Sequence, residues 1–160
     1  MIKEIGAMPQ SLTATEIIDG RNMIVYPGLI NTHHHLYQYF TRNLPQVQNL
    51  ELFDWLTALY EIWKDIDENV IEYSSLIGMG ELMKNGCTTC FDHHYVFPNQ
   101  TSDKLIDCQF EAAGKLGIRM HASRGSMDLS KKDGGLPPDS VVQDIDTDSE
   151  RLVDIMIGYS

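Results

Sequence analysis

Strand-like and helix-like segments alternate along the chain from residue 28 onward. Short apolar runs between turn residues predict buried strands, and runs with a helical apolar period predict helices. The strands are expected at residues 29–30, 87–97 and 118–123, and the helices at residues 52–63, 65–84, 102–116 and 147–157. Alternating strands and helices favour parallel βαβ units, so the predicted fold class is α/β.

Three βα units leave two architectures open. A closed (β/α)8 barrel needs eight strands and typically about 250 residues, whereas this chain has 160 residues. The chain therefore forms either a small open sheet or a part of something larger. The unpaired parallel edges of such a sheet would invite association with another chain.

The composition excludes several classes of protein. With 12 Lys+Arg against 23 Asp+Glu the formal charge is −11, and an acidic surface disfavours nucleic acid as a partner. No apolar run reaches the roughly 18 residues that span a membrane, and the N-terminus lacks a signal-peptide pattern. Three cysteines do not suggest a secreted disulfide scaffold. We therefore expect a cytoplasmic protein without membrane or nucleic-acid partners.

The first 27 residues are expected to form a unit separate from residues 28–160. Residues 16–18 and 23–26 read as two extended pieces that pair across the turn at residues 19–22. This pattern is typical of a β-hairpin from a small sheet. The alternative is a frayed leader without regular structure.

Capping signals place the ends of three helices. Asp65 followed by Glu68 resembles a capping box at the start of one helix, and Gly86 marks the end of that helix. Ser102 is the expected cap of the next helix, and Thr147 the expected cap of the last. The polar loop at residues 125–146 is long for a compact domain, so we expect it to act as a lid over a pocket.

A triple histidine follows the first expected strand, within residues 27–35. Alternate side chains along a strand share a face, so His33 and His35 should point the same way and His34 the opposite way. Two imidazoles on one face at the end of a buried strand form a natural half of a metal site. The alternative is a polar loop with exposed histidines.

Six segments of the chain resemble the amidohydrolase superfamily, specifically its cytosine-deaminase-like branch. The similarity begins at the triple histidine and continues through most of the sequence. Residues 121–127 and 133–140 most resemble the 8-oxoguanine deaminases of that branch, with triazine-ring hydrolases as close relatives. The matching segments are residues 27–38, 53–56, 86–89, 92–95, 121–127 and 133–140.

The resemblance implies a TIM-type (β/α)8 barrel beside a small β-sandwich, of which this chain would hold about three βα units and a sandwich remnant. It also implies one divalent metal, usually zinc, that activates a water. His33 and His35 match the metal-binding pair of the family. The remaining ligands, the proton-transfer glutamate and a further histidine follow later strands in the family, so they are expected beyond Ser160. A homo-oligomer is expected for the full-length form.

Four residues are candidates for substrate contact, two of them by the same resemblance. Gln38 lies where similar deaminases read a purine ring with an amide, and Trp55 where they pack an aromatic over the substrate. Arg124 ends the third strand and could fork onto a ring carbonyl and nitrogen. His94 is the fourth candidate, although strand parity leaves open whether it or His93 faces the pocket. The alternatives are an exposed glutamine, core packing and a surface ion pair.

The expected function is therefore a metal-dependent aminohydrolase that acts on the C–N bond of a purine-like small molecule. In the leading case 8-oxoguanine and water give urate and ammonia, with this chain as an incomplete portion of the enzyme. Hydrolysis of an amino- or chloro-triazine is the alternative within the enzyme class. A truncated, non-catalytic remnant that folds by association is the alternative outside it.

Overall fold

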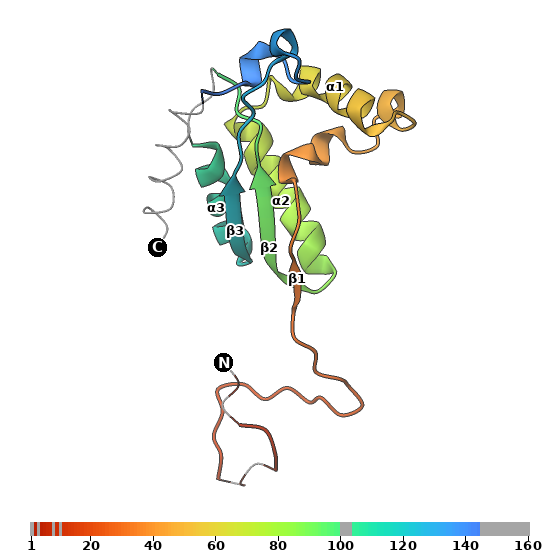
Figure 1. Ribbon diagram of the computed structural model, residues 1–160. Coiled ribbons are helices and arrows are strands. Elements are labelled where there is room, and N and C mark those ends of the chain that lie inside the picture. Colours follow the sequence, from red (N-terminus) through yellow and green to blue (C-terminus); the bar gives the residue numbers. More distant parts are fainter. Residues whose placement is uncertain (1, 3, 8, 10, 100–103, 145–160) are drawn as a thin grey trace.

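The computed structural model describes residues 2, 4–7, 9, 11–99 and 104–144, and Figure 1 shows its arrangement. Three strands form one parallel sheet in the order β1-β2-β3, so the alternation predicted from the sequence is confirmed as a mixed α/β fold. The strands are β1 (Leu29–Asn31), β2 (Cys87–His94) and β3 (Arg119–Arg124), and the α-helices are α1 (Leu52–Trp63), α2 (Glu68–Lys84) and α3 (Leu105–Leu116). Short 3-10 helices are η1 (Leu36–Thr41), η2 (Pro45–Val47), η3 (Lys131–Asp133) and η4 (Asp139–Val141).

The register of the sheet decides where the chemistry-bearing residues meet. β2 lies in the middle, with Asn31 of β1 opposite Cys90 and Arg124 of β3 opposite His94. Because all three strands run the same way, the segments that leave them emerge at one end of the sheet. In α/β proteins this end, at the carboxyl termini of the strands, is the usual place for a functional site.

Helices α2 and α3 pack together and cover the sheet, while α1 lies across the carboxyl end of the strands (Figure 1). The side chains between α2, α3 and β2 are small or apolar, and they exclude water from that face of the sheet. Their fully buried members include Met79, Cys90 and Ala112. Burial of this kind supplies the main driving force that holds helices on a sheet.

A second core lies beyond the strand ends and is rich in aromatic rings. Trp63 is 1% exposed, as is Tyr37, and the two rings meet edge to face with centroids 5.1 Å apart. The indole N–H of Trp63 donates a hydrogen bond to Thr41 Oγ1 over 3.1 Å. This core fixes η1 against α1, so the segment that follows β1 is held in place by packing on both sides.

The first residue of α2 differs from the sequence prediction. Asp67 is the N-cap, and its Oδ1 accepts a hydrogen bond of 2.8 Å from the Val70 amide, so the cap expected at Asp65 is wrong. Asp65 instead belongs to the turn after α1, where its amide donates to Ile62 O and the next residue, Ile66, is buried. Asp67 directly follows the buried Ile66, and its spacing from Val70 suits an N-cap.

The end of α2 agrees with the prediction. Asn85 is the C-cap, and Gly86 follows with φ of +82°, a left-handed conformation that glycine adopts without strain. The bounds expected for α1, residues 52–63, are also those observed.

The predicted hairpin between residues 16–18 and 23–26 does not form, since no strand occurs among the described residues before β1. Only its turn is present, where the Met23 amide donates to Gly20 O and Asp19 pairs with Arg21. Ile24 is 89% exposed and Val25 93%. A two-stranded hairpin without a sheet to cover it is marginal in water, which explains the extended chain. The division of the chain near residue 27 stays a prediction.

Two expectations concern residues outside the described part of the chain. The cap predicted at Ser102 and the helix predicted at residues 147–157 both lie there. Within the described residues, no helix is long and apolar enough to cross a membrane.

Candidate functional site

A cleft of about 510 Å³ opens at the carboxyl end of β1. Its walls come from the histidine segment, from η1 and the loop that follows, and from one aromatic residue of α1. The lining residues are His33, His34, His35, Gln38, Tyr39, Thr41, Arg42, Asn43, Gln48 and Trp55. All ten side chains are polar or aromatic, so the cleft offers hydrogen-bonding groups and ring faces to a small molecule.

His33 and His35 turn their rings toward one another in this cleft. Their Nε2 atoms are 3.2 Å apart, which confirms that the two side chains share a face. Two zinc–nitrogen bonds of about 2.0–2.1 Å at a near-tetrahedral angle would place the two nitrogens about 3.3 Å apart. The spacing of the pair therefore suits two ligands of one metal ion.

The ring of His35 is oriented by a backbone group of the neighbouring strand. Its Nδ1 lies 2.7 Å from the carbonyl oxygen of His93. Because a carbonyl oxygen only accepts, Nδ1 carries the proton and the Nε2 lone pair faces the cleft. Burial, above all, lowers the pKa of His35 below its usual value, which favours the neutral imidazole that binds metals.

A complete metal site is absent from the described residues, where no three His, Cys, Asp or Glu side chains converge. Two histidine nitrogens fit part of a ligand set, because catalytic zinc usually keeps three or more protein ligands.

Gln38 and Trp55 line the same cleft, so four of the six residues singled out from the sequence come together. The backbone N–H of Gln38 donates a hydrogen bond of 3.0 Å to His35 O. This bond places the Gln38 side chain one 3-10 turn after His33 and His35. Its Nε2 donates to the Tyr37 hydroxyl at 3.4 Å. Trp55 packs edge to face on Trp63, with ring centroids 5.6 Å apart.

His94 and Arg124 lie elsewhere. His94 is fully buried between the rings of Tyr37 and Phe97, with centroids 5.1 and 4.7 Å away, so the substrate contact expected of it has no counterpart in this geometry. The Arg124 guanidinium carbon lies 4.2 Å from the centroid of the Phe97 ring instead of lining the cleft. Strand alternation puts both side chains on the helix-covered face of the sheet.

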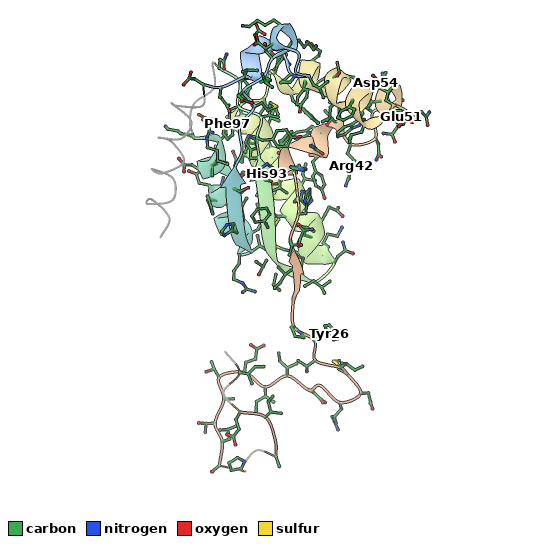
Figure 2. The ribbon with its side chains drawn as sticks, viewed as in Figure 1. Tyr26, Arg42, Glu51, Asp54, His93 and Phe97 are labelled. Atoms are coloured by element: carbon green, nitrogen blue, oxygen red, sulfur yellow. The ribbon has the colours of Figure 1, made fainter. Side chains whose placement is uncertain are left out.

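His93 has the opposite orientation to His94, and neither side chain lines the cleft. Its Nδ1 lies 2.6 Å from Ser123 Oγ on β3, on the face of the sheet that α2 and α3 leave uncovered. Figure 2 shows His93 near the carboxyl end of β2, with Phe97 beyond it. Through its carbonyl group His93 also holds His35, so its backbone contributes directly to the cleft.

Asp92 is a buried carboxylate that the sequence did not single out. Its Oδ1 accepts a hydrogen bond of 2.6 Å from the Leu36 amide, and its Oδ2 one of 2.7 Å from Gln109 Nε2 of α3. Burial raises the pKa of Asp92 to about 6, although the two hydrogen bonds oppose this shift. An aspartate within a predicted buried strand, directly after Phe91, was the available signal, because a buried carboxylate needs fixed donors.

The loop after β3 does not act as a lid in this structure. Its residues are absent from the lining of the cleft, and it docks on the core instead. Val141 is fully buried, the Asn99 amide donates to Ser140 O, and Gln143 donates to Phe97 O and Met127 O. Lys131 adds an ion pair to Glu61 of α1. The described part of the loop is therefore a fixed wall of the domain.

Gly78 of α2 gives η1 the space it occupies. A methyl group at Gly78 would lie 2.6 Å from Leu36 Cδ2 and 2.8 Å from the Tyr39 ring, whereas one at Gly80 would meet nothing within 4 Å. We expect Gly78→Ala to lower the free energy of unfolding by about 1–2 kcal/mol, since overpacking outweighs the gain in helix propensity. Gly80→Ala is the matched control and should raise it by up to about 1 kcal/mol. Urea unfolding monitored by tryptophan fluorescence measures both, and equal effects would contradict the contact.

Comparison with known proteins identifies the family. The amidohydrolase family model matches residues 24–157. The chain belongs to this family.

Two amidohydrolases of known activity are similar over most of the chain. An 8-oxoguanine deaminase from Pseudomonas aeruginosa is 43% identical over 151 residues, which are 92% of this chain and 33% of that protein. A hydroxydechloroatrazine ethylaminohydrolase from Pseudomonas sp. strain ADP is 43% identical over 143 residues, or 86% of this chain and 30% of that protein. The chain thus spans about a third of the length of these relatives.

A solved structure supports the same assignment. The atrazine chlorohydrolase TrzN from Arthrobacter aurescens TC1, complexed with zinc, superposes with a TM-score of 0.74 at 36% identity. The superposition covers 84% of this chain and 31% of TrzN. The described fold is therefore that of one part of an amidohydrolase.

Proposed function

We propose that this chain is the part of a zinc-dependent deaminase that carries the first metal ligands and one wall of the substrate site. The observation that carries the proposal is the convergence of His33 Nε2 and His35 Nε2, 3.2 Å apart, in a cleft that Gln38 and Trp55 also line. The fold would be the first three βα units of a (β/α)8 barrel, with the remaining ligands and the proton-transfer glutamate supplied from outside residues 1–160.

In this proposal a bound zinc supplies a Lewis acid that makes water nucleophilic near neutral pH. His33 and His35 hold it, and the carbonyl of His93 keeps His35 in the tautomer that can bind. Gln38 would donate to or accept from the edge of the ring, while Trp55 closes one side of the cleft. Attack of water on the amino-bearing carbon, followed by loss of ammonia, leaves a ring carbonyl.

8-Oxoguanine is the leading substrate, with urate and ammonia as products, because the deaminase from P. aeruginosa matches 92% of this chain. An amino- or chloro-triazine is the second candidate, favoured by the equal identity to the ethylaminohydrolase and by the likeness to TrzN. We further propose a cytoplasmic location and a homo-oligomeric full-length form.

The substrate is tested on the protein that contains residues 1–160 as isolated from its source. Ammonia and urate formed from 8-oxoguanine would support the leading candidate, and ethylamine released from an ethylamino-triazine the second. Failure to hydrolyse either ring, with zinc bound, would contradict the proposal. The 160-residue chain alone is expected to release no ammonia, because two histidines do not lower the pKa of water enough.

Metal binding by the chain itself gives a separate prediction. Cobalt titrated into the 160-residue chain should bind weakly, with well under one ion retained after gel filtration. His33→Ala and His35→Ala should each reduce this affinity by at least about tenfold. His121→Ala is the matched control, since His121 is an exposed histidine that stacks on Phe91 outside the cleft. Equal cobalt affinity in all three variants would show that the pair is not the site.

A further inference from the structure

Arg42 lines the cleft, but it has no part in the histidine motif or in the proposed chemistry. It follows η1 directly, and its backbone N–H donates to Tyr39 O. Residues three apart eclipse one another in a 3-10 helix, which brings Arg42 over the ring of Tyr39. The guanidinium carbon lies 4.6 Å from the centroid of that ring. Figure 2 shows Arg42 beside η1 and beneath α1.

The platform under Arg42 is itself fixed. The Tyr39 ring stacks on His34, with centroids 5.6 Å apart and planes 14° from parallel. Its other neighbour is Gly78 of α2, where even a methyl group would collide with the ring. His34, Tyr39 and Arg42 therefore form a stack along the cleft wall, which we call the arginine stack. Stacking of this kind holds a guanidinium in one plane.

The edge of the guanidinium remains available to a ligand. Stacking uses the face of the group, whereas its five N–H donors point outward in the plane. Within the described residues Arg42 forms no ion pair, although the chain carries 23 acidic residues. A cation in a cleft without a protein carboxylate is suited to an oxygen or an anion on the ligand.

We propose that the arginine stack is a subsite for a ring oxygen, as a carbonyl or an oxyanion, on the substrate that His33 and His35 help to hydrolyse. This inference rests on the proposed function and adds a selection rule to it. Planar rings that bear oxygen bind in preference to rings of the same size that bear only amino groups. The two similar enzymes of 43% identity are named for 8-oxoguanine and hydroxydechloroatrazine, whose rings carry such an oxygen, whereas TrzN, at 36% identity, is named for atrazine, whose ring carries none.

Two triazines of matched size test the rule. Cyanurate carries three ring oxygens and is anionic at pH 8, whereas melamine carries three amino groups and is neutral. Each is titrated into the 160-residue chain at pH 8, and the change in tryptophan fluorescence, to which Trp55 in the cleft wall contributes, reports binding. We expect cyanurate to bind at least about tenfold more tightly than melamine, because charge-assisted hydrogen bonds are the strong ones.

Three variants assign the preference to Arg42. Arg42→Gln should abolish the preference, because it should lower the affinity for cyanurate about tenfold and leave the affinity for melamine unchanged. Arg42→Lys, which keeps the charge but loses the planar fork, should retain only part of it. Arg21→Gln removes an equal charge from an exposed position outside the cleft and should have no effect.

The outcomes separate this inference from the proposed function. If both triazines bind equally and Arg42→Gln changes neither, the subsite is refuted while the cleft as a ring site stands. If neither triazine binds and Trp55 reports nothing, the cleft is not a ring site in this chain, and both proposals fail. Melamine binding in Arg42→Gln also shows that this variant is folded.

Discussion

Replacing Asp92 with alanine is expected to lower the free energy of unfolding by about 3 kcal/mol. The carboxylate is fully buried and accepts from Leu36 N–H and from Gln109 Nε2. Alanine leaves both donors without an acceptor and opens a cavity between β2, η1 and α3. Because Leu36 directly follows His35, the cleft should loosen as well. Urea unfolding gives the stability, and exchange of the Leu36 amide with solvent gives the local effect.

Asp92→Asn is the control for this substitution, and it should stay within about 1 kcal/mol of the original at pH 7.5. Burial raises the pKa of Asp92 to about 6, so its negative charge opposes folding above that pH, and asparagine removes the charge. Asparagine can still accept from the Leu36 amide. Its new N–H₂ can donate to Gln109 Oε1, which has no partner in the structure, if that amide turns over. An equal loss for both substitutions would contradict the role of Asp92 as a hydrogen-bond acceptor.

Local pattern was enough to predict the elements that build the site. The helical period places α1 at residues 52–63, and β2 starts at Cys87 as the apolar run indicated. The shared face of His33 and His35 also followed from strand alternation. These features depend on near neighbours in the chain, which is why a single sequence carries them.

Features that depend on distant contacts were missed. The hairpin signal at residues 16–26 is locally sound, but no sheet covers that segment among the residues that the structure describes. His94 was predicted to contact substrate because the sequence gives its position in the strand but not the side of the sheet on which its ring lies. The packing of α2 and α3 decides which side of the sheet is buried. Asp92 has its role only because Leu36 of η1 and Gln109 of α3 lie beside it in space.

The stability of the chain should respond to pH through two buried neighbours on β2, with opposite signs. Burial is the main cause that lowers the pKa of His94 from 6.5 to about 3. The unfolded chain therefore binds this proton below pH 6.5, while the folded chain does not. The stabilisation from neutral His94 is complete above pH 6.5 and is lost as pH falls toward 3, by about 3 kcal/mol at pH 4.5.

Asp92 opposes this loss. Its pKa is raised from 3.8 to about 6, so the folded chain holds a proton that the unfolded chain releases between these values. The resulting stabilisation is complete below pH 3.8 and disappears as pH rises to 6, and it amounts to about 2 kcal/mol at pH 4.5. In the unaltered chain the two effects nearly cancel between pH 6 and 4, so the free energy of unfolding should change little with pH there because of this pair.

Replacing either Asp92 or His94 should reveal how the other residue alone makes the free energy of unfolding depend on pH. Asp92→Asn should lose about 2 kcal/mol more than the unaltered chain when pH falls from 6.5 to 4.5, because only the His94 effect remains. His94→Phe, which keeps a ring between Tyr37 and Phe97, should instead gain stability relative to the unaltered chain over the same range. Urea unfolding at half-unit pH intervals measures the differences, in which all other titrating groups cancel. Parallel curves for the three proteins would mean that neither group changes its proton affinity on folding.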